Sequence, residues 1–151
     1  MNFTEEHICF QVPGKQKLDI LKYVAAKAKE LNICDNSEGL LIDLLHREEE
    51  FSTGLQDGFA IPHARSSHVK EASILFLKTE DEVEWGTMDG NNVHYLFSLL
   101  VPKENEGNVH LMMLSQLATC LLEDDFKDYV KKCDDKQALV SYIYKGMEES
   151  V

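Results

Sequence analysis

The chain has few positive charges for its 151 residues. Lysine and arginine number 15 against 27 aspartate and glutamate residues, which gives a formal net charge of -12 at pH 7. A nucleic-acid-binding protein needs clustered lysine and arginine side chains to neutralise phosphates, and an anionic membrane surface attracts the same residues. The charge balance therefore argues against nucleic acid and against an anionic membrane as partners.

The chain also lacks the patterns of secretion, membrane insertion and paired cysteines. Residues 1–6 are acidic and polar, whereas a secretory signal is basic and then apolar. No apolar run approaches the length of a membrane span. Since no C-x-x-C pair is present, we expect a reduced, cytoplasmic protein without disulfides or direct membrane insertion. We expect all four cysteines to be buried free thiols: Cys9, Cys34, Cys120 and Cys133.

Apolar periodicity predicts alternating helices and strands. Helical spacing is found over 15–31, 37–48, 109–122, 124–132 and 134–147, and strand-length apolar runs over 8–12, 59–61, 72–78 and 93–102. Ser37, Asn108 and Asp134 are the expected N-caps of three helices. The runs at 72–78 and 93–102 are apolar enough for strands covered on both faces. The sequence therefore predicts one α/β domain over 1–151, with a mixed sheet flanked by helices on both faces.

Two histidines stand at expected junctions between regular elements. The first, His63, follows the apolar run Phe59-Ala60-Ile61 and Pro62. Proline fixes its own φ and biases Ile61 toward extended conformations, so the imidazole is presented from a stiff approach. The second, His110, lies in the first turn of its predicted helix, near unpaired backbone N–H groups that attract anions. Such a histidine can act as base, ligand or nucleophile.

Structural and metal-binding interpretations compete with a catalytic one. His63 and His110 could each be packing residues, or could bind zinc together with Asp57, although no H-E-x-x-H, H-x-H or Cys/His cluster is present. Of the other four histidines, we expect His7 in a frayed terminus and His46 on a helix surface. We expect His68 in an exposed loop and His94 in the core or at the edge of the sheet.

Several separated motifs occur in a fixed order along the chain. They are Arg47-Glu48, Ser52-Thr53-Gly54, Gly58-Phe59-Ala60-Ile61-Pro62-His63-Ala64-Arg65, Trp85-Gly86, Asp89-Gly90, Gly107-Asn108-Val109-His110-Leu111 and Leu114-Ser115-Gln116-Leu117-Ala118. Together they resemble the enzyme IIA domains of the bacterial phosphoenolpyruvate-dependent sugar phosphotransferase system, fructose/mannitol class. The resemblance spans about 15 to 144, and its W-G-x-x-D-G stretch is more similar to the fructose-type branch.

The resemblance implies a role for each matching position. His63 matches the histidine that accepts a phosphoryl group from the phosphocarrier HPr and passes it to enzyme IIB, which serves sugar uptake through the enzyme IIC permease. His110 matches a second active-site histidine that is not phosphorylated, and Arg47 matches an active-site arginine. Asp57 falls where only some members have a carboxylate, so its role stays open. No cofactor and no tightly bound metal are implied.

General chemistry agrees with these roles. Phosphoryl transfer needs positioning and charge stabilisation, and a neutral imidazole nitrogen is the nucleophile. The other ring nitrogen needs a partner, which a backbone carbonyl or Asp57 could supply. The donors of Arg47 can neutralise phosphoryl oxygens. Ser52 and Thr53 could add donors or could be turn-forming residues. Arg65 could add donors too, or could be a solvated or partner-facing residue.

Two protein partners must reach the histidine in turn. We therefore expect a shallow cleft ringed by apolar residues, with Phe59 and Met113 as candidates for which core packing is the alternative. Two other functions remain open. One is a regulatory protein like the nitrogen-related enzyme IIA proteins, which would act by binding a target. The other is a metal-dependent hydrolase that uses His63, His110 and Asp57.

Overall fold

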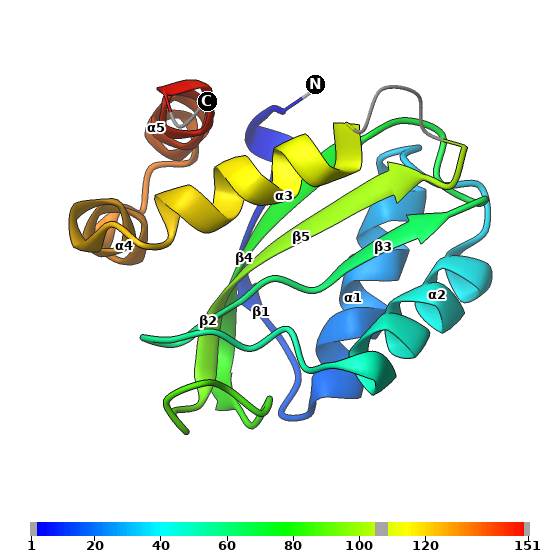
Figure 1. Ribbon diagram of the computed structural model, residues 1–151, viewed down its shortest axis with the longest axis horizontal. Helices are drawn as coiled ribbons and strands as arrows, with labels where there is room; N and C mark the ends of the chain where they lie inside the picture. Colours follow the sequence, from blue (N-terminus) through cyan, green and yellow to red (C-terminus); the bar gives the residue numbers. More distant parts are fainter. Residues whose placement is uncertain (1–2, 105–108, 150–151) are drawn as a thin grey trace.

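One five-stranded mixed sheet organises the chain (Figure 1). The computed structural model describes residues 3–104 and 109–149, the side chains of 109 and 110 excepted. The strands are β1 (Ile8–Val12), β2 (Phe59–Ala60), β3 (His63–Ser66), β4 (Ser73–Val83) and β5 (Val93–Pro102). The order is β1-β4-β5, and both β2 and β3 pair with the outer edge of β5. Strand β4 is antiparallel to β5 and all other pairs are parallel, so the predicted mixed sheet is confirmed.

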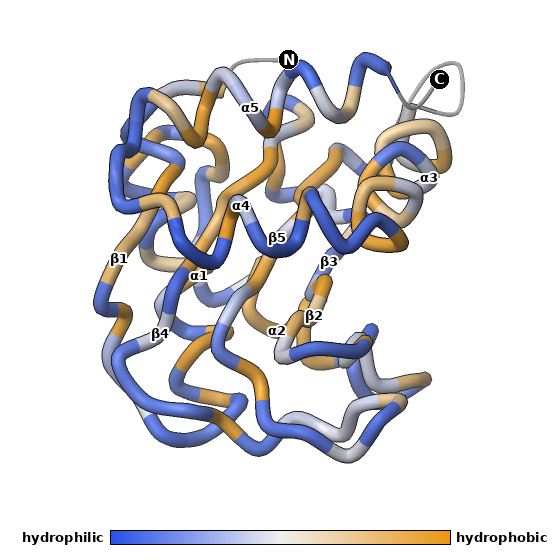
Figure 2. Tube along the Cα trace, turned by 90° about the vertical axis from the view of Figure 1, so that its left-hand side faces the viewer, coloured by the Kyte–Doolittle hydropathy of each residue, from blue (hydrophilic) through white to orange (hydrophobic). Residues whose placement is uncertain are grey.

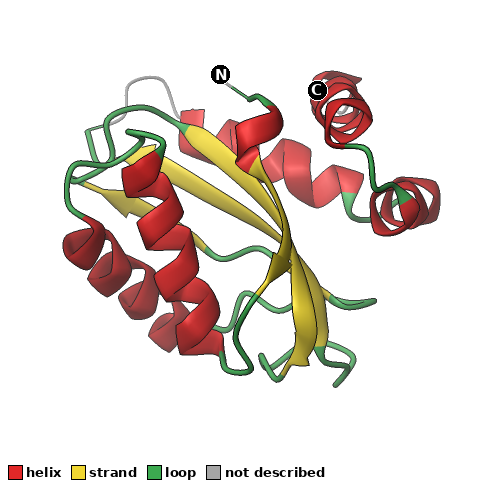
Figure 3. Ribbon diagram, turned by 180° about the vertical axis from the view of Figure 1, so that it is seen from behind, coloured by secondary structure: helices red, strands yellow, loops and turns green. Residues whose placement is uncertain are grey.

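Helices cover both faces of the sheet, as predicted (Figures 1 and 3). On one face lie α1 (Lys17–Glu30) and α2 (Ser37–Glu50), and on the other lie α3 (Val109–Cys120), α4 (Asp124–Lys132) and α5 (Lys136–Glu149). A 3-10 turn, η1 (Glu5–His7), precedes β1. Within the part of the chain that the structure describes, no helix is both long and apolar enough to cross a membrane.

The sheet separates two apolar cores. In β4, Leu75 and Leu77 pack on the α1 and α2 side, while Ile74 and Phe76 pack on the side of α3, α4 and α5. Successive side chains of a strand point to opposite faces, so a strand buried on both faces has an unbroken apolar run. Figure 2 shows apolar residues along the strands and polar ones along the outer turns. Each fully buried side chain of this size contributes roughly 1.5–3 kcal/mol.

Helix caps differ from the predictions by one residue. The N-cap of α2 is Asn36 rather than Ser37, and a side-chain oxygen of Asp135, rather than Asp134, accepts the backbone N–H bond at the start of α5. Asn, Ser and Asp are nearly equivalent as N-caps, so neighbouring candidates cannot be separated by residue type. Asn108 lies outside the described residues.

Two other local features differ from expectation. Strand β4 continues past Lys78 to Val83, with a register shift against β5 that accommodates its polar end. His7 is buried, and its Nδ1 accepts a hydrogen bond from the backbone N–H of Thr4 at 3.1 Å, so the expected frayed terminus is wrong from Phe3 onward. The aromatic ring of Phe3 packs against that of His7.

A proline divides the edge strand into β2 and β3. Pro62 has no N–H to donate to the ladder, so regular pairing stops at Ala60 and resumes at His63. The carbonyl of Pro62 still accepts the N–H of Leu99 at 3.2 Å. His63 therefore occupies the first position of β3, beside the C-terminal half of α2, which packs on this strand.

Candidate functional site

The imidazole of His63 is held in one neutral tautomer. Its side chain is buried, and the residue is only 6% exposed. Nδ1 lies 2.7 Å from the carbonyl oxygen of Ile61, and a carbonyl can only accept, so Nδ1 carries the proton. Arg47 Nε donates to Nε2 at 3.2 Å, so Nε2 presents its lone pair. Of the two partners considered for the tautomer, the backbone carbonyl is the one present.

Burial lowers the pKa of His63 below its ordinary value of 6.5. The hydrogen bond to the Ile61 carbonyl opposes this shift, the positive charge of Arg47 adds to it, and the negative charge of Glu48 again opposes it. The net direction is downward, so the ring is neutral at pH 7. A neutral ring is the nucleophilic form.

Arg47 connects the imidazole to the end of α2. It belongs to the last turn of the helix, and its Nη1 donates to the carbonyl oxygen of Phe51 at 2.9 Å. That carbonyl follows the helix, where backbone oxygens have no partner within the helix. The guanidinium is thereby held against Nε2, where it can neutralise negative charge that arrives on this nitrogen.

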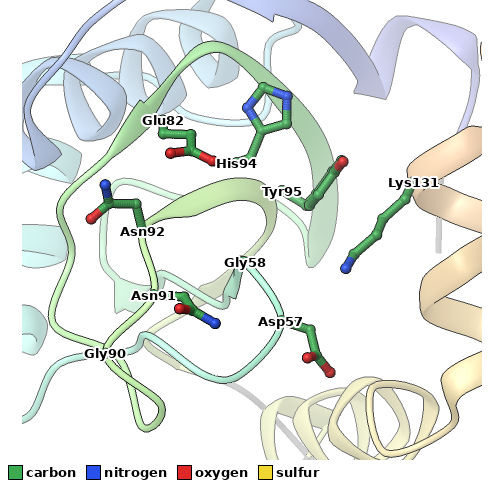
Figure 4. Close-up of a pocket in the computed structure, with 9 residues that line it drawn as sticks. All are labelled: Asp57, Gly58, Glu82, Gly90, Asn91, Asn92, His94, Tyr95 and Lys131. Carbon is green, nitrogen blue, oxygen red and sulfur yellow. The ribbon is translucent and has the colours of Figure 1, made fainter.

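Asp57 lies away from His63. Its carboxylate Oδ2 is 2.5 Å from Lys127 Nζ, and its backbone N–H donates to Asp89 Oδ2 at 3.0 Å. Phe59 pairs with Tyr95 of β5, and His63 pairs with Leu99 of the same strand. The two positions on β5 are about 13 Å apart along the strand, and Asp57 lies before Phe59. Asp57 instead lines an open polar cavity of about 570 Å³, into which Lys131 extends between Tyr95 and Asp57 (Figure 4). The Nζ of Lys131 lies 5.6 Å from the centre of the Tyr95 ring.

The other expected phosphoryl donors have different partners. Ser52 Oγ donates to the carbonyl of Trp85 at 3.0 Å, and Thr53 Oγ1 donates to the carboxylate of Glu48. The guanidinium of Arg65 donates to the carbonyl of Lys103 at 3.1 Å. These contacts favour the structural interpretation of all three residues.

His110 lies in the first turn of α3, as predicted, but its side chain is outside the described residues. Phe59 and Met113 are both buried in the core on the α3 side, so core packing, the alternative considered for them, is confirmed and neither lines a docking cleft. Exposed apolar side chains occur instead at Phe51, which is 76% exposed, and at Leu111. Apolar character alone does not tell which face of an element a residue occupies.

The chain offers no clustered metal ligands among the side chains that are described. No group of three or more His, Cys, Asp or Glu residues there could hold a metal ion. The ligand set considered from the sequence is not brought together, because Asp57 pairs with Lys127 at a distance from His63. All four cysteines are free thiols, and Cys133 is the one that is partly exposed.

Nearly the whole length of the chain matches a known protein family. The family model described as "Phosphoenolpyruvate-dependent sugar phosphotransferase system, EIIA 2" matches residues 1–146. The chain belongs to this family. The family resemblance found in the motifs is thereby confirmed over almost the whole chain.

Curated relatives include fructose-specific and nitrogen-regulatory members of this family. A fructose-specific EIIA component of Haloferax volcanii is 27% identical, over 95% of this chain and 92% of its own. A fructose-specific EIIABC component of Bacillus subtilis is 29% identical over 93% of this chain, which spans only 22% of that longer protein. A nitrogen regulatory protein of Pseudomonas aeruginosa is 34% identical, over 87% of this chain and 85% of its own.

Solved structures of the same fold support the family assignment. The nitrogen regulatory protein IIA-Ntr of Neisseria meningitidis superposes with a TM-score of 0.83 at 28% identity, covering 92% of this chain and 94% of its own. The mannitol enzyme IIA of Escherichia coli, in a complex with phosphorylated enzyme IIB, has a TM-score of 0.76 at 13% identity over 98% of both chains. The second likeness shows the fold alone.

Proposed function

We propose that this chain is an enzyme IIA phosphohistidine carrier of a sugar phosphotransferase system. It accepts a phosphoryl group from HPr on His63, passes it to enzyme IIB, and serves the enzyme IIC permease indirectly. It acts as one domain in the cytoplasm. One observation carries the proposal: His63 is a buried neutral imidazole with its proton on Nδ1 and its Nε2 lone pair facing Arg47.

In the acceptance step, the Nε2 lone pair forms a bond to phosphorus. The bond between phosphorus and the donor's leaving group breaks, and its electron pair stays with the donor. The Nδ1 proton remains on the ring and keeps its hydrogen bond to the Ile61 carbonyl, so no proton leaves His63. The guanidinium of Arg47 shifts from Nε2 to the phosphoryl oxygens, where charge-assisted hydrogen bonds stabilise the negative charge.

The transfer to enzyme IIB is the reverse displacement. A nucleophilic group of enzyme IIB forms a bond to phosphorus as the P–N bond to His63 breaks. The electron pair of the broken bond returns to Nε2, and Arg47 again donates to that nitrogen. Since the starting state is restored without a net proton change, the carrier is ready for another cycle. His110, at the start of α3, is proposed to donate to the same phosphoryl oxygens.

The direct test is phosphorylation by enzyme I, HPr and phosphoenolpyruvate. We expect acid-labile, base-stable phosphate on the wild type and none on His63→Ala. The control is His46→Ala, which removes an exposed histidine of α2 and should keep the label. No label on the wild type, or label on His63→Ala, would sink the proposal.

A regulatory role is the second candidate. The likeness to nitrogen regulatory proteins, 34% identical in Pseudomonas aeruginosa, favours it. Such a protein would also be labelled on His63 but would act by binding a target. The two candidates separate when labelled protein is mixed with a cognate enzyme IIB: rapid loss of phosphate to enzyme IIB supports transport, and its retention supports regulation.

A further inference from the structure

Glu48 is a buried carboxylate beside the site that the proposed reaction does not use. Its side chain is only 5% exposed. Three donors converge on it: Lys17 Nζ at 3.0 Å, the backbone N–H of Thr53 at 3.2 Å, and the hydroxyl of Thr53. A buried carboxylate is tolerated only when it is paired and hydrogen-bonded in this way.

A continuous series of hydrogen bonds leads from Glu48 to the imidazole. Glu48 holds Thr53 by its N–H and hydroxyl, and Trp85 Nε1 donates to the same hydroxyl oxygen at 3.1 Å. The carbonyl of Thr53 accepts the N–H of Ile61 at 3.0 Å. The carbonyl of Ile61 in turn accepts the Nδ1 proton of His63 at 2.7 Å. The acceptor that sets the tautomer is therefore positioned through Thr53.

Glu48 also stabilises the other side of the ring. It follows Arg47 directly in α2, and its ion pair with Lys17 ties the end of this helix to the start of α1. Arg47 holds Nε2 from this same helix end. One carboxylate thus connects the two segments that contact the two ring nitrogens of His63.

We propose that Glu48 is a positioning residue for phosphoryl transfer, which fixes the tautomer and orientation of His63 through Thr53 and Ile61. The inference rests on the proposed function. Without Glu48, Thr53 loses two hydrogen bonds and the Ile61 carbonyl is no longer held at the ring. Part of the neutral imidazole then takes the other tautomer, in which Nε2 carries the proton and has no lone pair with which to attack phosphorus.

The test compares Glu48→Ala with Glu49→Ala, a control that removes the same charge from an exposed neighbour. Imidazole ¹⁵N NMR at alkaline pH reports the tautomer. We expect the Nδ1–H form of His63 in the wild type and in the control, and a mixture in Glu48→Ala. The pKa of His63 should fall in Glu48→Ala, because a negative charge that raises it is lost. Phosphorylation by HPr should slow roughly tenfold, because fewer molecules present the Nε2 lone pair in the reactive orientation.

Glu48→Gln is the conservative variant. Its amide oxygen can still accept one bond from Thr53, so both the tautomer ratio and the rate should lie between wild type and Glu48→Ala. If Glu48→Ala does not fold, Glu48→Gln is judged by the same readouts, and a mixture of tautomers with a rate below that of the wild type supports the proposal. Wild-type tautomer and rate in the folded Glu48 variants overturn it. Absence of phosphorylation in the wild type overturns the proposed function instead, and the NMR result still decides the role of Glu48.

Discussion

Two polar residues flank β2, Asp57 before it and His63 after it, and their surroundings are built differently. At His63 the side chain is buried and neutral, with one nitrogen bound to a carbonyl and the other facing the cation of Arg47. At Asp57 the carboxylate is half exposed and forms an ion pair with the buried side chain of Lys127. The two residues are six positions apart in sequence but belong to separate environments.

The difference shows what a phosphoryl acceptor needs. Nε2 has a lone pair next to Arg47, a cation that can shift onto an incoming phosphoryl group. Asp57 has its charge compensated, and its backbone has φ near +59°, a conformation that the bond to Asp89 helps to hold. We therefore propose that Asp57 joins the turn before β2 to α4 and takes no part in the reaction.

The largest expected effect comes from Arg47→Ala. Phosphorylation of His63 by HPr should slow about 100-fold, because the charge-stabilising donors at Nε2 are lost. Thermal unfolding should stay near that of the wild type, since Arg47 is partly exposed. Arg65→Ala is the matched control: its guanidinium contacts the exposed Lys103 backbone, so the rate should be unchanged. A loss of stability that accounts for the slower rate would make Arg47 a structural residue.

The effect of pH on the rate of phosphorylation of His63 is expected to be smaller than that of Arg47→Ala and larger than that of Asp57→Asn. Burial lowers the pKa of His63, so the acceptance rate should stay flat down through pH 6.5 and fall about tenfold per pH unit below the lowered pKa. NMR titration measures this pKa directly. Arg47→Ala should raise it, because a repelling positive charge is removed, whereas Asp57→Asn should leave it unchanged. A wild-type pKa at or above 6.5 contradicts the buried neutral ring.

The lowered pKa of His63 also makes the free energy of unfolding depend on pH. Below pH 6.5 the unfolded chain protonates His63 before the folded protein does, so the unfolded state binds more protons. The contribution of His63 to the free energy of unfolding therefore decreases as pH falls from 6.5 to the lowered pKa, and is constant below it. His63→Ala should remove this part of the pH dependence in denaturant titrations.

The smallest effect on the reaction is expected for Asp57→Asn. The rate of phosphorylation should stay within about twofold of wild type, while the free energy of unfolding falls by about 1 kcal/mol, because buried Lys127 loses an ionised partner. Asp124→Asn is the control, since Asp124 is exposed and 3.6 Å from the same lysine, and should change stability less. A rate of phosphorylation as slow as that of Arg47→Ala would show that Asp57 takes part in the reaction.

Much of the fold could be predicted from periodicity, because buried strands and amphipathic helices impose different spacings. The site could be predicted only in part. The proline before His63 indicated how the ring is presented. The resemblance left open whether Asp57 contacts the ring, and the extended chain between the two residues places Asp57 beside Lys127 instead. Glu48 was visible only as a neighbour of Arg47. Its importance depends on hydrogen bonds through Thr53, which no local pattern reveals.

The ring nitrogen that carries the phosphoryl group is the most direct test of His63 as the acceptor. Protein labelled with ¹⁵N-histidine and phosphorylated through HPr can be examined by ³¹P and ¹⁵N NMR. We predict one phosphoryl group, on Nε2 of His63, with the Nδ1 proton retained. Phosphate on Nδ1 of His63, or on another residue, would contradict the tautomer that the Ile61 carbonyl and Arg47 impose.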